Sequence, residues 1–417
     1  MKHIIKRGCF LTLMFMLLGC LSLYAADNDL ITKQITINLE KAGTLPDRIG
    51  SSKKYKITNL KIIGEINGTD LRMIRDMAGS SSNGNSTDGK LSVLDLSKAK
   101  IVEGGDCYHI NYYTSNDVIG SYAFDGCSGL TNLTLPAGIT EIGEGAFFGC
   151  SGLTSLTLPA GITKIGSFAF LGCRGLTSLT LPAGITKIGD YAFRGCRGLT
   201  SLTLPAGITE IGYNAFQYCS GLTSLTLPAG ITEIGDYAFQ HCSGLTSLTL
   251  PAGITKIGDY AFQHCSGLTS LTLPAGITRI DDYAFYGCSG LTSLNLPAGI
   301  TSIGDEAFQN CSGLTSIYVY AEKVPKIGSN VFGEVDAKKC TLYVPMGTYD
   351  DYWLSGFGDY FENIVEFEAT GIDKTTTSTD VEEVARYSVN GQRLSAPTKG
   401  LNIVKYSDGS VKKVAVQ

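Results

Sequence analysis

A cysteine returns at every 23rd residue, nine times in succession, inside a unit that reads CSGLTSLTLPAGITxIGxxAFxx. Leucine, isoleucine, alanine and phenylalanine keep fixed places after each cysteine, so every unit offers the same apolar positions. A fixed period of this length is typical of coils that stack along one axis. The nine cysteines are Cys127, Cys150, Cys173, Cys196, Cys219, Cys242, Cys265, Cys288 and Cys311.

A single coil is not expected to fold alone, because its apolar side chains bury too little surface to offset the entropy of ordering the chain. We therefore predict a repeat solenoid, a leucine-rich, right-handed stack of about eleven coils and roughly 50 Å in length. Each SLTL segment indicates a short strand of a parallel sheet on one face, with short turns or helical turns on the other. The aspartate of the GDYAF segment is placed to cap such a helical turn, at Asp190, Asp236, Asp259, Asp282 and Asp305.

The motif fades toward both ends of the chain. Alternating residues predict strands at 34–39 and 55–66, residues 69–78 favour a helix, and residues 340–344 look like the last strand. A cluster of Trp353, Phe357, Tyr360 and Phe361 is expected to close the far end. The domain boundaries we predict are a signal peptide (1–26), an N-terminal cap with a degenerate first coil (27–90), the solenoid with its C-terminal cap (91–368, regular at 127–310), a Thr-rich linker (369–383) and a small β unit (384–417).

The N-terminus indicates export. Lys2, Lys6 and Arg7 precede an apolar run at residues 10–18, which is typical of a secretory signal peptide, and no later segment is apolar enough to span a membrane. Cleavage near Ala25 or Ala26 fits the continuing apolar stretch, whereas the residues before Cys20 resemble a lipoprotein signal in which Cys20 is lipidated. Charged residues are 17% of the chain and the net charge is −5, so nothing indicates a nucleic-acid partner.

Thirteen cysteines in an exported chain would ordinarily indicate disulfides. Here the repeated cysteines occupy one position of each coil, so their side chains point in parallel, and nine is an odd number for pairing. We therefore predict a column of buried free thiols. A metal or other cofactor is not expected, because ligands must converge on one point and these side chains diverge along an axis.

Positions that vary between coils are the candidates for binding. Aromatic and amide side chains gather at adjacent positions of the turn side, where they suit contact with a protein or a glycan, although the rings could equally stack on one another and seal the coil edge. The candidate ligand-binding residues are Tyr191, Tyr237, Tyr260, Tyr283, Arg194, Gln240, His241, Gln263 and His264.

Two other surfaces allow the same pair of interpretations. The outward Ser and Thr of the SLTL strands form an uncharged face that could bind an extended peptide or glycan, or could be ordinary solvent-exposed strand surface. A column from Glu141 to Ser302 mixes both charges, with three opposite and three like neighbours, so a solvated face is expected rather than an ion-pair ladder.

Catalysis is not expected, because the chain holds four histidines and His241 and His264 occupy equivalent positions rather than a converging site. Two irregular segments, residues 79–90 and 103–117, offer the alternative of a localised site beside the N-terminal cap.

The unit CSGLTSLTLPAGITKIGDYAF resembles the leucine-rich repeats of BspA-like surface proteins of host-associated anaerobic bacteria, over about residues 91–345. The resemblance implies a protein that is secreted or attached to the outer cell surface and adheres to host extracellular-matrix proteins or to other bacteria, meeting a membrane only through its anchor. The tail, through YSVNGQRL and KGLNIVKYSDG, resembles a type IX secretion sorting domain. Glycan binding for nutrient capture and a purely structural spacer are the alternative functions.

Overall fold

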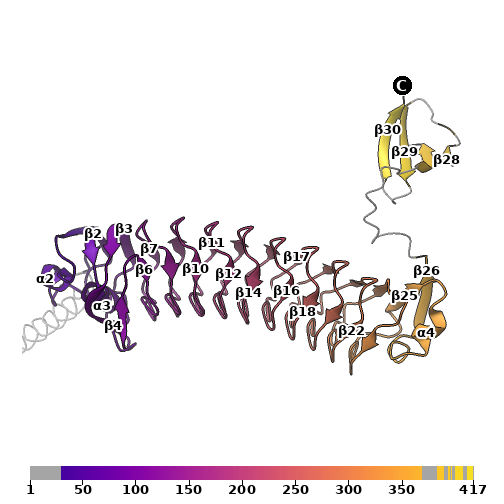
Figure 1. The fold of residues 1–417 in the computed structure, drawn as a ribbon, viewed down its shortest axis with the longest axis horizontal. Coiled ribbons are helices and arrows are strands. Elements are labelled where there is room, and N and C mark those ends of the chain that lie inside the picture. Colours follow the sequence, from indigo (N-terminus) through magenta and orange to yellow (C-terminus); the bar gives the residue numbers. More distant parts are fainter. Residues whose placement is uncertain are drawn as a thin grey trace, which may run out of the picture.

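The computed structural model describes residues 30–368 and, beyond them, residues 383–388, 393–394, 396, 400–406 and 411–416. The expected signal peptide, Cys20 and residues 369–382 of the expected linker lie outside this part of the chain. Residues 30–368 form an elongated parallel β-solenoid, which confirms the predicted fold class (Figure 1).

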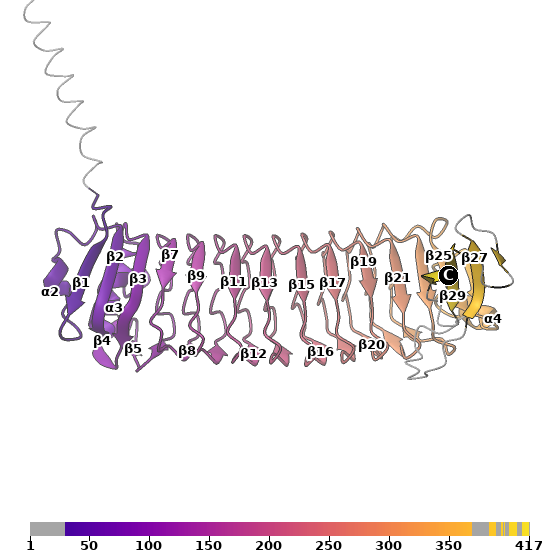
Figure 2. The same cartoon turned by 90° about the horizontal axis from the view of Figure 1, so that it is seen from above.

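One strand of each coil joins the first strand series, whose members lie side by side along the molecule (Figure 2). Neighbouring strands pair in parallel and in register, so that Leu133 lies opposite Leu156. Each regular strand buries its Leu and exposes the Ser and Thr on either side, as the alternation predicts. The strands of the repeats are β7 (Asn132–Thr134), β9 (Ser155–Thr157), β11 (Ser178–Thr180), β13 (Ser201–Thr203), β15 (Ser224–Thr226), β17 (Ser247–Thr249), β19 (Ser270–Thr272), β21 (Ser293–Leu296) and β23 (Ser316–Val319).

A second strand series follows the turn at PAG, with two residues from each coil. It holds β6 (Val118–Ile119), β8 (Glu141–Ile142), β10 (Lys164–Ile165), β12 (Lys187–Ile188), β14 (Glu210–Ile211), β16 (Glu233–Ile234), β18 (Lys256–Ile257), β20 (Arg279–Ile280), β22 (Ser302–Ile303) and β24 (Lys326–Ile327). Between the two series lies one continuous core, in which phenylalanines of successive coils stack, as Phe147 does on Phe170 at 5.2 Å between ring centroids.

The side of the coil that carries GDYAF contains turns, and no helix occurs between residues 118 and 340. The residue after the aspartate has left-handed backbone, for example Tyr237 with a φ of 57°, so the chain turns there instead of continuing as a helix. The aspartate accepts a hydrogen bond from the next coil: Asp236 Oδ1 from the N–H of Asp259 at 3.0 Å, and Asp259 Oδ1 from that of Asp282 at 3.0 Å. The predicted helix-capping role of these aspartates is therefore wrong, and they join adjacent coils instead.

The N-terminal cap belongs to the solenoid. Its elements are β1 (Ile35–Leu39), α2 (Leu45–Ile49), β2 (Asn59–Ile66), α3 (Gly68–Met77) and β3 (Val93–Ile101), followed by the hairpin of β4 (Gly104–His109) and β5 (Tyr112–Thr114). Because β1, β2 and β3 pair in parallel and β3 pairs with β7, the cap extends the first strand series.

The far end adds β25 (Thr341–Pro345), α4 (Tyr349–Trp353) and β26 (Asn363–Phe367). The strand at residues 340–344 is thus followed by one more, which pairs with it in parallel. Phe357 and Phe361 are buried as expected, whereas Trp353 is 46% exposed and does not close the end.

Within residues 30–368, the first strand series holds fourteen strands in groups of five, two and seven, so the prediction of about eleven coils was too low. Strands of the caps lack the repeat motif and could not be counted by it. Separately, β27 (Glu383–Ser388), β28 (Arg393–Leu394), β29 (Gly400–Tyr406) and β30 (Val411–Val416) form a four-stranded antiparallel sheet.

Candidate functional site

The candidate tyrosines form a column of stacked rings on the turn side. Tyr260 lies between Tyr237 and Tyr283, with ring centroids 4.7 and 4.6 Å away and nearly parallel planes. Tyr191 stacks on Phe168 at 4.9 Å. These half-buried rings therefore contact mainly one another. This is the second of the two interpretations of the sequence, in which the rings stack and seal the edge of the coils.

The other candidate residues form a second column beside the first. His241 lies between Tyr218 and His264, at 4.7 and 4.8 Å between ring centroids. The amides of Gln217, Gln240 and Gln263 form a chain of hydrogen bonds from coil to coil. We call the two columns together the turn ladder. Burial, and then the neighbouring His264, lowers the pKa of His241 from its ordinary value.

Arg194 ends the second column, with its guanidinium 5.5 Å from the ring centroid of Tyr191 and 5.8 Å from that of Tyr218. The structure thus brings all nine predicted binding residues onto one edge of the solenoid. Several of them, including Tyr237 and His241, occupy left-handed backbone where Gly or Asn is favoured. Such strain concentrates at functional positions, although here the ring stacking compensates for it in part.

One of the coils at which the turn ladder is irregular contains Tyr213. Tyr213 occupies the place of the usual Asp, and Asn214 the place of the usual Tyr. The ring of Tyr213 contacts Tyr191 and Tyr237 edge-on, at 5.5 and 5.3 Å, and 40% of the residue is exposed. Because a tyrosine side chain has no carboxylate to offer the next coil, the aspartate ladder is interrupted here.

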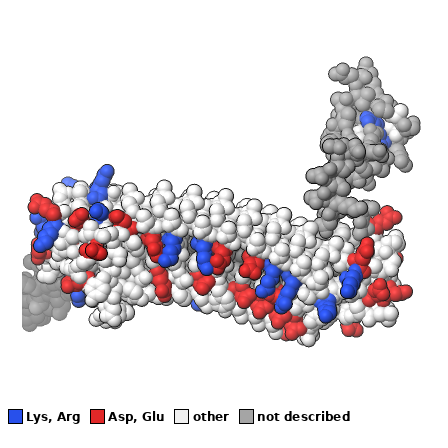
Figure 3. All heavy atoms as spheres, viewed as in Figure 1, with Lys and Arg blue, Asp and Glu red and all other residues white. Residues whose placement is uncertain are grey.

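The charged column lies on the second strand series, where Figure 3 shows basic and acidic side chains mixed in a band along the molecule. Opposite neighbours form ion pairs, Lys164 with Glu141 and Lys187 with Glu210, each at 2.6 Å. The third opposite pair does not form, because Lys256 turns to the buried Asp281 at 3.0 Å. The sequence predicted a solvated face instead of an ion-pair ladder, and the structure adds these separate ion pairs to it.

One of the three pairs of like charges coincides with a break in the second strand series. Glu210 and Glu233 occupy equivalent positions of β14 and β16, and these two strands do not pair. A cavity of about 490 Å3 opens there, lined by Glu210, Glu233, Tyr213, Asp190 and Asp236 among others. Lys256 of β18 lies opposite Arg279 of β20, and these two strands do pair, because Asp281 contacts both cations.

The strand face, formed by the outward Ser and Thr of the first strand series, is exposed and uncharged in the regular coils. It is interrupted between β9 and β11 and between β13 and β15, where cavities of about 370 and 440 Å3 lie. The nine repeated cysteines are buried and free, as predicted. From Cys150 onward each thiol donates to the carbonyl of a Phe in the preceding coil, as Cys196 does to Phe170 at 3.1 Å.

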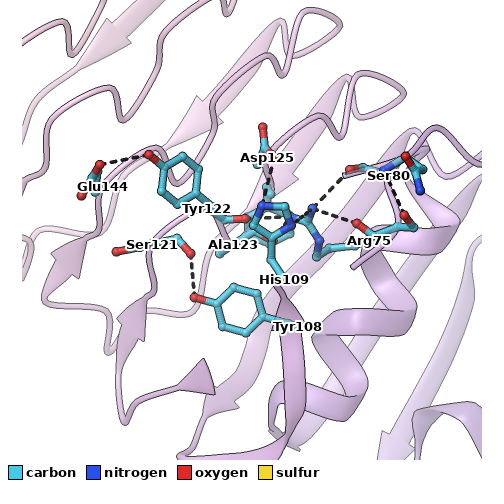
Figure 4. Close-up of polar contacts among 12 residues, drawn as sticks. Arg75, Ser80, Tyr108, His109, Ser121, Tyr122, Ala123, Asp125 and Glu144 are labelled. Atoms are coloured by element: carbon cyan, nitrogen blue, oxygen red, sulfur yellow. Dashed lines mark hydrogen bonds and ion pairs between the residues drawn. The ribbon is translucent and has the colours of Figure 1, made fainter. Parts of the chain in front are cut away.

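A cluster that the sequence did not predict joins the cap to the first coil. We call it the cap clasp: Arg75 of α3, His109 of β4 and Asp125 of the turn after β6 (Figure 4). Arg75 is fully buried and donates to the carbonyls of Tyr122 and Ala123 at 2.7 and 3.1 Å.

The imidazole of His109 lies between the two charged groups of the clasp. Arg75 Nη2 is 3.0 Å from His109 Nδ1, and His109 Nε2 is 3.4 Å from an oxygen of Asp125. Burial, and then Arg75, lowers the pKa of His109, whereas burial raises the pKa of Asp125. Arg75 and His109 lie outside the repeat, and Asp125 occupies a position that varies between coils, so only the irregular segment around His109 gave a signal.

The fold and its repeats define a leucine-rich repeat solenoid. The profile of the BspA type leucine rich repeat region matches in six copies, within residues 117–246 and 209–341, which together make up more than half of the chain. The chain therefore belongs to the BspA type leucine-rich repeat family. Solenoids of this family are typically protein-binding and not enzymes.

Solved structures similar to the chain include a leucine-rich repeat protein from Bacteroides ovatus, with 25% identity over 61% of this chain and 82% of the other, at a TM-score of 0.41. A leucine-rich repeat protein of T. pallidum has 33% identity over 38% of this chain and 74% of its own, at 0.35. The pneumococcal vaccine antigen PcpA has 20% identity over 75% and 80%, at 0.42. No curated protein matches the chain. Within the described residues, no helix has the length and apolar character needed to cross a membrane.

Proposed function

We propose that the chain is a secreted or cell-surface protein that mediates adhesion by binding other proteins along the side of its solenoid. The strand face carries the proposal. Exposed Ser and Thr recur at the same two positions of successive coils, in register, as in Ser201 and Thr203 opposite Ser178 and Thr180. Repeated weak contacts along such a face add up to useful avidity.

Extracellular-matrix proteins of a host, or surface proteins of other bacteria, are the partners that we propose. The test is saturation binding of the chain to immobilised fibronectin and fibrinogen, with soluble glycans as competitors. Removing residues 219–241, and then residues 196–264, deletes one and three whole units and keeps the register of the rest. Affinity should fall with each deletion; saturable binding that is unchanged by both deletions would contradict contact along the strand face.

Glycan binding is the second candidate, and Tyr213 favours it. Its ring is exposed beside a cavity lined by carboxylates, and an aromatic ring next to hydrogen-bonding groups suits a sugar. Replacing Tyr213 with Ala, or Tyr237 and Tyr260 together with Ala, should then abolish binding on a glycan array. Retained glycan binding in both variants would remove the turn ladder from consideration.

Export and anchoring are proposed from the two termini. We propose that residues 1–26 direct export and that residues 384–417 act as a sorting domain. Mass spectrometry of the mature protein tests both, because cleavage near Ala25 and a lipidated Cys20 give different N-terminal peptides. A mature protein that retains residues 1–26 would contradict the export signal, and one that keeps residues 384–417 would contradict a removable sorting domain.

A further inference from the structure

The hairpin of β4 and β5 carries two large exposed apolar residues near its tip. Ile110 is 56% exposed and Tyr113 is 60% exposed. The hairpin projects from the N-terminal part of the solenoid, next to the turns of the first coils (Figure 1). Exposed aliphatic and aromatic side chains that lie together are typical of a contact surface for a protein.

The backbone of Ile110 is strained, with a φ of 44°. Left-handed backbone is uncommon for any residue with a side chain, and a β-branched residue there is a clear outlier. In a hairpin loop such a position favours Gly or Asn. An exposed isoleucine at this place therefore lowers the stability of the fold and gains no packing in the core. Such a combination is typical of a residue that contacts a binding partner.

Hydrogen bonds to the N-terminal cap and to the first coil hold the hairpin in a fixed position. The N–H of Ile110 donates to the carbonyl of Ser82 at 2.7 Å, and the hydroxyl of Tyr108 donates to the carbonyl of Ser121 at 2.8 Å. The N–H of Asp106 donates to Thr69 of α3 at 2.9 Å, and the cap clasp fixes His109. A rigid support lowers the entropy lost on binding, so these contacts prepare the tip for docking.

The hairpin's own segment of the chain carries charge of one sign only. Residues 101–125 contain four carboxylates, Glu103, Asp106, Asp117 and Asp125, and no Lys or Arg. Asp125 is engaged by His109, whereas Glu103 and Asp106 are exposed. On the side of α3, Asp106 shares a pocket with Lys54 and Arg72. The exposed carboxylates of the segment itself disfavour acidic partners and favour a partner whose contact surface is basic.

We propose that the hairpin tip is a docking point for a protein, with Ile110 and Tyr113 entering an apolar recess that is rimmed by Lys or Arg. The inference rests on the proposed protein-binding function and gives it a local anchor at the N-terminal end. It differs from contact along the strand face in that the anchor lies outside the regular coils.

The test uses the whole chain and three immobilised probes: fibronectin, fibrinogen and a peptide of repeating Arg-Leu-Leu-Arg, with its Glu-Leu-Leu-Glu counterpart as reference. The variant Ile110→Asn with Tyr113→Ser removes both apolar groups. A matched control, Met346→Ser with Leu354→Asn, removes two apolar residues that are 62% and 83% exposed at the far end. Because Asn tolerates left-handed backbone, Ile110→Asn should not lower the melting temperature.

We expect the hairpin variant to bind the basic peptide about tenfold more weakly, while the control binds as the unaltered chain does. The acidic peptide should not bind, and added salt should weaken binding to the basic one. Equal binding by the hairpin variant and the unaltered chain, or no binding of the basic peptide at all, would overturn the proposal.

The two proposals fail separately. If unit deletions leave binding to fibronectin or fibrinogen intact while the hairpin variant loses it, contact along the strand face is wrong and the anchor stands. If neither matrix protein binds but the basic peptide does, the adhesion target is wrong and the anchor again stands. Loss of binding in the unit deletions together with full binding by the hairpin variant removes the anchor alone.

Discussion

Nη2 of Arg75 lies 3.0 Å from Nδ1 of His109, and both side chains are buried. A guanidinium can only donate, so Nδ1 accepts and the ring proton resides on Nε2, facing Asp125. A second proton on Nδ1 would set two donors and two positive charges against each other. The cap clasp is therefore built for a neutral histidine.

Acidification should weaken the N-terminal cap. The folded state holds the pKa of His109 below its usual 6.5, so the unfolded chain binds this proton first as the pH falls, and stability is lost below about pH 6.5. Asp125 works in the opposite direction at lower pH, because its pKa is raised in the fold. Urea unfolding at about pH 7.5 and 5.5 measures the difference.

The control for this prediction is His109→Gln, whose amide can accept from Arg75 and donate to Asp125 without titrating. The variant should lose less stability on acidification than the unaltered chain, even though His241 remains in both. An equal loss in the two proteins would show that His109 does not set the pH dependence.

The aspartate ladder should tolerate loss of charge but not loss of the acceptor. In Asp259→Asn an oxygen still accepts from the N–H of Asp282, so the free energy of unfolding should change little. Asp259→Ala removes the acceptor and should cost about 1 kcal/mol. Chemical denaturation of the two variants side by side checks this; equal stability would mean that the contact contributes nothing.

The pair of like charges at Glu210 and Glu233 should be destabilising. Glu233→Gln removes the repulsion across the break between β14 and β16 and should raise the free energy of unfolding by about 0.5 kcal/mol. Glu141→Gln is the matched change, because it removes an attraction to Lys164 at 2.6 Å and should lower stability slightly. If both substitutions act in the same direction, repulsion does not explain the break.

The repeated thiols should be unreactive in the folded protein. Burial raises the pKa of Cys196 and of Cys242 to about 12, so the reactive thiolate is scarce at neutral pH. Among the described cysteines, the half-buried Cys107 should be alkylated first, and the nine repeated cysteines only after denaturant is added. Peptide mass spectrometry locates the label; rapid alkylation of Cys242 without denaturant would contradict the burial argument.

The repeat made most of the fold predictable, since a residue that returns at a fixed spacing must occupy one place in every coil. The same reasoning predicted the free thiols, and it gave stacking of the tyrosines as one of two interpretations. The prediction failed where one coil contacts the next through a backbone turn. Asp236 was predicted to cap a helix, because a tyrosine at position 237 gives no indication that its backbone is left-handed.

The cap clasp and the hairpin lay beyond sequence reasoning for a different reason. Arg75 and Tyr122 are 47 residues apart, and their contact depends on how an unrepeated cap folds against the first coil. Periodicity carries no information about such contacts. The strands β1 and β2 escaped the coil count in the same way, because they join the sheet by backbone pairing without the motif.

The regular repeats are joined by the same backbone and thiol contacts, and most of them also by the aspartate contact, so whole units can be added or removed while the remaining joints keep these contacts. Every unit then moves the N-terminal hairpin about 4.8 Å further from α4. The length of the solenoid therefore changes in steps of one repeat, and the number of repeats sets the distance between its two ends.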